Sequence, residues 1–324
     1  MQGQTVDAMA ADGLREDCVL VTFDIDGTLI ESEGPDANLI HKDAFAIAFK
    51  SLGLQGASIE DCKHHGMTDP LIIQLIVEHH RGKVWGQSVG PKCGAKVWGG
   101  KGGSLNQQDM DQAMGAMCAY AEAKAKESEG AAGIGLKALP GVKEALESLG
   151  PPCFHCALTT GNLEPIAWMK MEALGLKSHF DAPLLGGFGS DYWGKDPTKG
   201  AEDRAQLLRV AHHRWVEAIA PAGDLQGSPP STSSPRDHVH VGDSPYDIKA
   251  AVLAGAMPVG VTTGIFTEAD LREAYEGCFE GSGSPERDLL VIRDFDRDFD
   301  VFWEALCTFF RRMKPNAMAM PERK

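Results

Sequence analysis

The stretch Cys18-Val-Leu-Val-Thr-Phe-Asp-Ile-Asp-Gly-Thr-Leu29 leads a short apolar run directly into two carboxylates, Asp24 and Asp26, and a glycine. Residues 19–23 predict a strand that is buried on both faces. In open α/β sheets, such strands end at the crevice where ligands bind. Asp24 and Asp26 are therefore predicted to lie at a ligand site. The alternative is an ordinary turn, since Asp and Gly are common turn residues.

The spacing of these two carboxylates points to a particular chemistry. Neighbouring carboxylates repel each other, so both stay ionised only when a cation or a hydrogen-bond donor compensates them, or else one carries a proton. The pair suits a bound divalent metal, with one carboxylate as a nucleophile and the other as a general acid and base.

Two further strand ends carry compatible side chains. The sequence His238-Val-His-Val-Gly-Asp-Ser-Pro-Tyr-Asp247 predicts a second apolar strand, with Asp243 in the loop after it and Asp247 at a helix start. A third strand, residues 154–158, runs into Thr159-Thr-Gly-Asn162, where a hydroxyl, backbone N–H groups and an amide precede a helix. This is a plausible anion cradle.

These motifs, in this order, resemble those of the haloacid dehalogenase-like hydrolase superfamily, and most of all its phosphoglycolate-phosphatase-like branch. The resemblance covers roughly residues 18–295. It implies that Asp24 attacks phosphorus and becomes an aspartyl phosphate, while Asp26 protonates the leaving oxygen and then activates water. It also implies that Asp24, the backbone carbonyl of Asp26 and Asp243 hold Mg²⁺, with Asp247 ordering that shell.

The resemblance further assigns the phosphate-binding groups. Thr160 and the N–H of Gly161 would bind phosphoryl oxygens. The family also has a Lys or Arg that neutralises the nucleophile and the phosphoryl group, and three cations in this chain are candidates for it: Lys195, Lys199 and Arg204. Arg204 is favoured because it immediately precedes a helical pattern and resembles a variant found in some relatives, and Lys199 is next.

The function implied is that of a Mg²⁺-dependent phosphatase hydrolysing small phosphate monoesters. Dehalogenating relatives and phosphonatases lack a carboxylate two residues after the nucleophile, whereas this chain has Asp26. An alkoxide leaving group needs a proton donor and a halide does not. Two alternatives remain: a phosphomutase of the β-phosphoglucomutase type, which shares the motifs, and a non-catalytic binding protein that retains the fold.

The motif spacing predicts an α/β fold, with a doubly wound, Rossmann-like parallel sheet and an inserted module. The sheet is expected not to resume between Leu29 and about residue 154, so we expect residues 1–30 and 137–324 to form the core. Residues 31–136 read mostly as helices, and we expect them to form a cap inserted after the first strand. Within it, Gly66-Met-Thr-Asp69 resembles a cap segment that faces the active site.

Composition limits the partners. The chain has 324 residues, with 31 Lys and Arg against 46 Asp and Glu. This acidic balance disfavours nucleic acid or an anionic membrane as partner. We expect a small phosphorylated metabolite as partner, and a monomer or homodimer. No apolar run approaches a membrane span, which favours a cytoplasmic setting, with import into an organelle left open.

One stretch of the expected cap has no counterpart in this plan. Between residues 81 and 104 the sequence Lys83-Val-Trp-Gly86 recurs as Lys96-Val-Trp-Gly99, within a Gly-rich segment. We favour a surface insertion here over a substrate-gating loop that would offer Trp faces and Lys side chains to an anionic substrate.

Overall fold

The structure is a computed structural model that describes residues 18–34, 37–62, 64–82, 104–127, 135–180, 183–219, 237–279, 289–317 and 322–323. The repeated Lys-Val-Trp-Gly segment lies outside the described residues. Among the described helices, none combines the length and the apolar composition needed to cross a bilayer.

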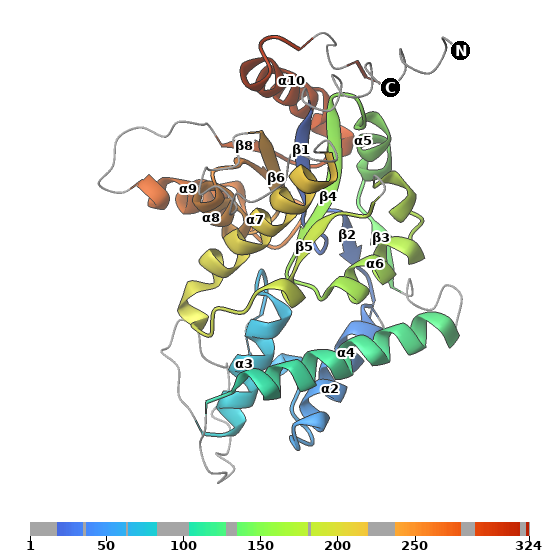
Figure 1. The fold of residues 1–324 in the computed structure, drawn as a ribbon, viewed down its shortest axis with the longest axis vertical. Coiled ribbons are helices and arrows are strands. Elements are labelled where there is room, and N and C mark those ends of the chain that lie inside the picture. The colour runs from blue at the N-terminus through green and yellow to red at the C-terminus, as the bar shows by residue number, and fades with distance from the viewer. Residues whose placement is uncertain are drawn as a thin grey trace, which may run out of the picture.

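The centre of the molecule is a parallel sheet of six strands in the order β5-β4-β1-β6-β7-β8 (Figure 1). Its strands are β1 (Val19–Phe23), β4 (Phe154–Thr160), β5 (Gly186–Phe188), β6 (His238–Gly242), β7 (Met257–Val261) and β8 (Leu290–Ile292). All the pairings between neighbours are parallel. The predicted doubly wound α/β fold is confirmed. Since β1 lies between β4 and β6, the three strand ends singled out in the sequence are neighbours.

Helices cover both faces of this sheet. They are α5 (Val142–Ser148), α6 (Glu164–Ala173), α7 (Gly200–Ile219), α8 (Pro245–Ala254), α9 (Glu268–Glu276) and α10 (Phe295–Met313). Val19, Val21 and Phe23 of β1 pack in one cluster with α5, α6 and α10. Leu20 packs on the opposite face with Trp215 of α7. The side chains of a strand alternate between faces, so the apolar residues on both faces of β1 are what a sheet covered on both sides requires. Thr22, the polar residue of this strand, is buried as well.

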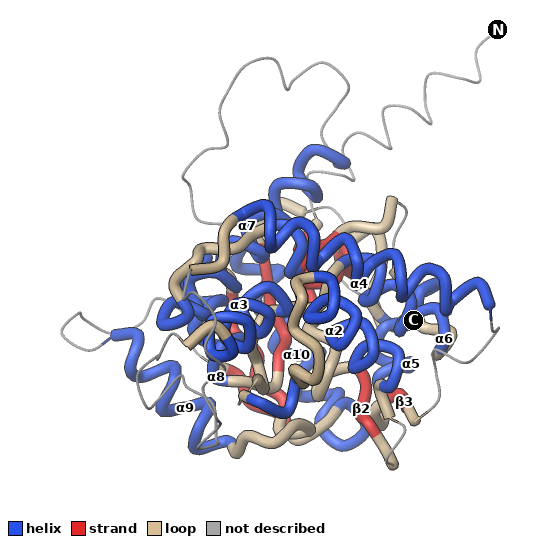
Figure 2. The backbone as a smooth tube through the Cα atoms, turned by 90° about the horizontal axis from the view of Figure 1, so that it is seen from below, coloured by secondary structure: helices blue, strands red, loops and turns tan. Residues whose placement is uncertain are grey.

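A helical insertion follows the first strand of the sheet. It contains α2 (Leu39–Ser51), α3 (Asp69–His80) and α4 (Gln107–Glu127), whose apolar side chains form a cluster together with Leu163, Ile166 and Met169 at α6. Met110 and Met117 of α4 are buried in that cluster. Figure 2 looks onto these helices. The insertion is bounded by two short antiparallel strands that the sequence did not predict, β2 (Ile30–Ser32) and β3 (Leu136–Ala138). Residues 31–136 as a separate domain stay a prediction.

One close approach in the core can be tested by substitution. A Cβ atom added at Gly187 of β5 would overlap the backbone carbonyl of Leu207 in α7. We expect Gly187→Ala to lower the free energy of unfolding by about 2 kcal/mol or more, because the helix must move away from the sheet. Gly115 is exposed in α4 with open space around it. Gly115→Ala should raise the free energy of unfolding by about 0.5 to 1 kcal/mol. Urea unfolding measures both, and equal effects would contradict the packing described.

Candidate active site

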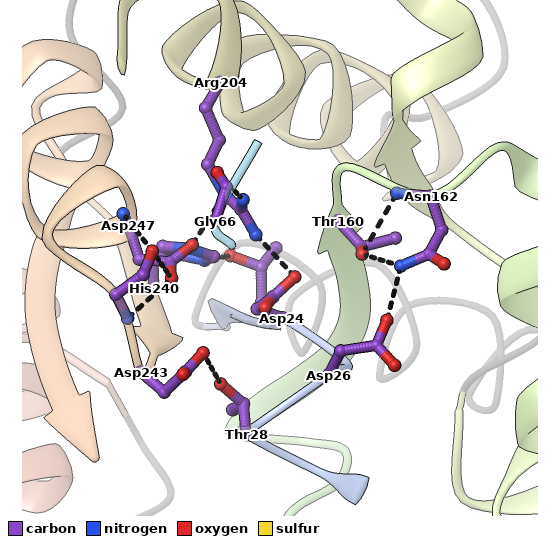
Figure 3. Close-up of polar contacts among 12 residues, drawn as sticks. Asp24, Asp26, Thr28, Gly66, Thr160, Asn162, Arg204, His240, Asp243 and Asp247 are labelled. Carbon is purple, nitrogen blue, oxygen red and sulfur yellow. Dashed lines mark hydrogen bonds and ion pairs between the residues drawn. The ribbon is translucent and has the colours of Figure 1, made fainter. Parts of the chain in front are cut away.

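The predicted site residues meet at the carboxyl ends of the three central strands (Figure 3). Asp24 follows β1, Thr160 ends β4 and Asp243 follows β6. These ends border a cavity of about 610 Å³ between the sheet and the insertion, a size suited to a small ligand. Its polar lining from the core includes Asp24, Asp26, Thr160, Gly161, Asn162, Arg204 and Asp243, and its lining from the insertion includes His41, Lys42, His64, His65 and Asp69.

The Arg204 side chain contacts groups from three separate segments of the chain. It projects from the beginning of α7 and is only 2% exposed. Its Nη2 lies 2.5 Å from Oδ1 of Asp24, and its Nε lies 2.6 Å from Oδ1 of Asp247. Its Nη1 donates to the backbone carbonyl of Gly66, at 2.9 Å. One planar guanidinium therefore pairs with two carboxylates and also holds a loop of the insertion.

The other two candidate cations lie elsewhere. Lys195 is exposed, with its ammonium 5.3 Å from the ring centre of Trp193. Lys199 is exposed at the end of the short 3₁₀ helix η5 (Pro197–Lys199). Neither lysine lines the cavity. Of the three cations, the structure places Arg204 against Asp24.

Three buried carboxylates lie together at the cavity wall. Asp24, Asp243 and Asp247 each offer an oxygen within 4.8 Å of the others. Burial, reinforced by the neighbouring carboxylates against the pull of Arg204, raises the pKa of Asp24 to about 7. Burial, with Asp247 and Asp24 close by, also raises the pKa of Asp243 well above its usual value. The cluster thus carries more negative charge than Arg204 alone compensates.

Asp247 differs from its two neighbours because its oxygens are already taken. Burial opposes its ionisation, but Arg204, His240 and Ser244 outweigh burial and lower its pKa to about 2. The backbone N–H and the hydroxyl of Ser244 donate to Oδ2 at 3.0 and 2.7 Å, and His240 Nε2 lies 3.3 Å from Oδ1. Asp247 is therefore a fixed anion that orients Arg204.

The donor set fits a divalent cation such as Mg²⁺. Carboxylate oxygens are the ligands that this ion prefers. Around Asp243 the backbone is held close, because a Cβ added at Gly27 or Gly264 would overlap its carboxylate. Its Oδ1 accepts a long hydrogen bond, 3.4 Å from Thr28 Oγ1. Asp24 and Asp243 thus have oxygens available to a cation, whereas Asp247 would act beside them by ordering the site.

Asp26 lies apart from this cluster and points toward Asn162 (Figure 3). Asn162 Nδ2 donates to it at 2.9 Å, and the ammonium of Lys170 donates to both its oxygens at 2.7 and 2.9 Å. Burial opposes the charge of Asp26, but Lys170, with smaller contributions from His41 and Asn162, outweighs burial and lowers its pKa. Asn162 Nδ2 also donates to Thr160 Oγ1, at 2.8 Å.

The sequence motifs did not identify Lys170 as a residue of the site. It lies in α6 on the side of Ile166 and Ala167, both buried, and it is completely buried itself. A charged residue at the helical spacing of an apolar face was the available signal.

The loop before α3 closes against Gly161. The backbone N–H of Asp69 donates to the carbonyl of Gly161 at 2.8 Å. The carboxylate of Asp69 accepts from the N–H of Leu163 at 3.0 Å and lies 3.0 Å from His41 Nε2. A Cβ at Gly161 would lie 2.6 Å from the carbonyl of Met67, so this contact needs glycine. The segment Gly66–Asp69 therefore faces the site.

The fold and these groups define the class of protein: an α/β protein with a parallel sheet whose carboxyl edge combines a buried guanidinium with a cluster of carboxylates that includes Asp24. The model of the haloacid dehalogenase-like hydrolase family matches residues 19–255. The chain belongs to this family of hydrolases, as its motifs predicted.

Comparison with curated proteins gives no match. Similar solved structures include a hydrolase from Pseudomonas syringae, with 18% identity over 88% of this chain and 98% of that chain and a TM-score of 0.49. A predicted phosphatase from Clostridium acetobutylicum has 17% identity over 89% and 99%, with a TM-score of 0.49. A predicted phosphoglycolate phosphatase from Haemophilus somnus 129pt has 18% identity over 88% and 98%, with a TM-score of 0.46.

The position of Arg204 makes a specific prediction. Arg204→Ala is expected to lower kcat by about a hundredfold or more, because one preorganised electrostatic donor contributes on that scale. Arg204→Lys should recover only part of the loss, since an ammonium cannot contact two carboxylates as the planar group does. Lys195→Ala and Lys199→Ala are the matched controls and should change kcat little. Steady-state kinetics measures all four, and a larger loss in either lysine variant would contradict the assignment.

Proposed function

We propose that this chain is a Mg²⁺-dependent phosphatase that hydrolyses small phosphate monoesters through a phosphorylated Asp24. The observation that carries the proposal is the different surroundings of the two paired carboxylates. Asp24 contacts Arg204 beside the carboxylate cluster, whereas Asp26 has its own donors, Lys170 and Asn162. Two carboxylates in separate settings can take separate roles, one as nucleophile and one as acid and base.

In the first step, an oxygen of Asp24 attacks phosphorus and the bond from phosphorus to the leaving oxygen breaks. Asp26, whose pKa Lys170 lowers against the effect of burial, must first take up a proton from solvent. It then gives this proton to the leaving oxygen, so that the product leaves as an alcohol. Arg204 stays paired with Asp24 and faces the phosphoryl oxygens, which it stabilises as charge develops on them. Thr160 and Gly161 line the same cavity, and we expect them to bind the remaining oxygens.

In the second step, Asp26, now ionised, takes a proton from a water molecule that attacks the phosphorylated Asp24. The bond between phosphorus and the Asp24 oxygen breaks, which releases phosphate, restores the Asp24 carboxylate and leaves the proton of the water on Asp26. When bound to Asp24, Asp243 and the backbone carbonyl of Asp26, Mg²⁺ would supply the positive charge that lets the anionic phosphate approach this acidic site.

The same proposal covers partners and setting. A chain with a net charge of −15 must attract phosphate locally rather than by its overall field. We propose a small phosphorylated metabolite as the substrate and a cytoplasmic setting, with the protein acting as a monomer or homodimer and without nucleic acid or membrane as partner.

A panel of phosphate monoesters, assayed with and without Mg²⁺, tests this function. Release of free phosphate from some members, only with Mg²⁺, is the expected result. Formation of an isomeric sugar phosphate without release of phosphate would instead indicate a phosphomutase. Absence of both reactions across the panel, in a folded protein that binds phosphate, would favour a non-catalytic binding protein.

A further inference from the structure

Lys170 is a buried charge for which the proposed mechanism has no role. It lies in the last turn of α6 and no part of it is exposed. Its ammonium donates to the two oxygens of Asp26 and to Oδ1 of Asn162, at 2.9, 2.7 and 2.9 Å. An ammonium has three N–H donors, so this arrangement uses its full capacity.

Asn162 closes this arrangement from the other side. Its Oδ1 accepts from Lys170, while its Nδ2 donates to Asp26 at 2.9 Å and to Thr160 at 2.8 Å. Asp26, Asn162 and Lys170 therefore form a closed triangle of hydrogen bonds. Removal of one member would leave polar groups of the other two without their partner, and such a loss inside a protein is costly.

Lys170 approaches Asp26 from behind. Asp26 and Asn162 line the cavity, but Lys170 does not. The side chain of Asp26 is 38% exposed toward that cavity, while that of Lys170 is sealed in the core. A phosphate in the cavity therefore meets the carboxylate and not the ammonium, so any effect of Lys170 on the reaction passes through Asp26.

The surroundings of Lys170 do not require a charge for packing. Its neighbours along α6 include the buried residues Ile166, Ala167, Met169 and Met171. Replacing both members of a buried ion pair by apolar residues is often neutral or stabilising, so packing alone does not call for an ion pair at this place. The position of the ammonium thus points to a function at Asp26.

We propose that Lys170 is a positioning residue that holds the carboxylate of Asp26 in the orientation needed to pass a proton to the leaving oxygen. This inference rests on the proposed function. Asp26 follows a strand end, where Gly27 has a φ of 89° and the backbone turns sharply. Within the described part of the chain, the side chains of Lys170 and Asn162 donate hydrogen bonds to the Asp26 carboxylate. Without Lys170, the Asp26 carboxylate would keep the hydrogen bond from Asn162 to Oδ2 but lose the donor to Oδ1. A single hydrogen bond holds its orientation less firmly, and it could turn toward Arg204 and the metal-binding side of the cavity.

The leaving group decides the test, because only a poor leaving group needs the proton. The experiment measures the rate of alcohol release in the first turnover for two substrates. One is an alkyl phosphate, and the other is p-nitrophenyl phosphate, whose phenolate leaves without protonation. Lys170→Met should slow release from the alkyl phosphate by about a hundredfold, the scale of general acid catalysis, and release of p-nitrophenol by about threefold or less. In Asp26→Asn, adding Lys170→Met should change the alkyl rate little, since residues that act as a unit are not additive.

Met171→Ala is the matched control, since Met171 is also fully buried in α6. It opens a cavity without touching Asp26, so any loss should be equal for the two substrates. If Lys170→Met does not fold, Lys170→Gln gives the same comparison. Equal losses for both substrates, or full activity toward the alkyl phosphate, would overturn the positioning role. Failure of the proposed function is distinct, because the wild-type protein would then release neither alcohol.

Discussion

Asp24→Asn is expected to lower kcat for phosphate release by about 10⁴-fold or more, the scale on which the loss of a covalent nucleophile acts. The amide is a poor nucleophile and cannot form the aspartyl phosphate. It would also lose the charge that pairs with Arg204 at 2.5 Å. Steady-state phosphate release with the best substrate of the panel measures this effect.

The fold should survive this substitution. Burial and the neighbouring carboxylates oppose the ionisation of Asp24 and raise its pKa to about 7, so removal of its charge also removes repulsion. Arg204 keeps its contacts with Asp247 and Gly66. We therefore expect a melting temperature no lower than that of the wild type. Phosphate release near the wild-type rate would show that Asp24 is not the nucleophile.

Removal of divalent metal is expected to lower activity at least about a thousandfold, and Mg²⁺ should restore it. The carboxylate cluster is anionic and so is the substrate. A metal that stabilises the charge of the transferring phosphoryl group contributes several kcal/mol, and each factor of ten in rate corresponds to about 1.4 kcal/mol. The measurement is phosphate release in a chelator, followed by titration with Mg²⁺.

Asp243→Asn separates a metal effect from a general salt effect. A ligand that binds only the folded protein stabilises it, so Mg²⁺ should raise the melting temperature of the wild type. The same addition should raise that of Asp243→Asn much less, because one of the available carboxylates of the cluster is gone. Undiminished activity in chelator would contradict the metal site proposed at Asp243.

The sequence could predict the sheet and the position of its carboxylates. The run Val19–Phe23 is apolar except for Thr22 and has few stable structures other than a strand covered on both faces, and the end of this strand fixes the position of Asp24. The choice among the three candidate cations could also be narrowed from the sequence. Arg204 lies near the start of a long amphipathic helix, whereas Lys195 and Lys199 lie in the segment before that helix.

The partner of Asp26 could not be predicted in this way. Lys170 is 144 positions away from Asp26 in the chain. Their contact depends on the pairing of β1 with β4 and on the packing of α6 beneath β4, which are tertiary features. The short strands β2 and β3 were missed for a similar reason, since three residues carry too little periodicity to be recognised.

The central claim is that phosphate passes through Asp24, and a trapped intermediate tests it most directly. In Asp26→Asn, p-nitrophenyl phosphate should still transfer its phosphoryl group, because p-nitrophenolate leaves without a proton. Water would then attack slowly without its base. Acid quenching during turnover, followed by mass spectrometry of the peptide containing residues 19–29, should show a phosphoryl group on Asp24. A burst of p-nitrophenol with no phosphoryl group on Asp24 would contradict the account.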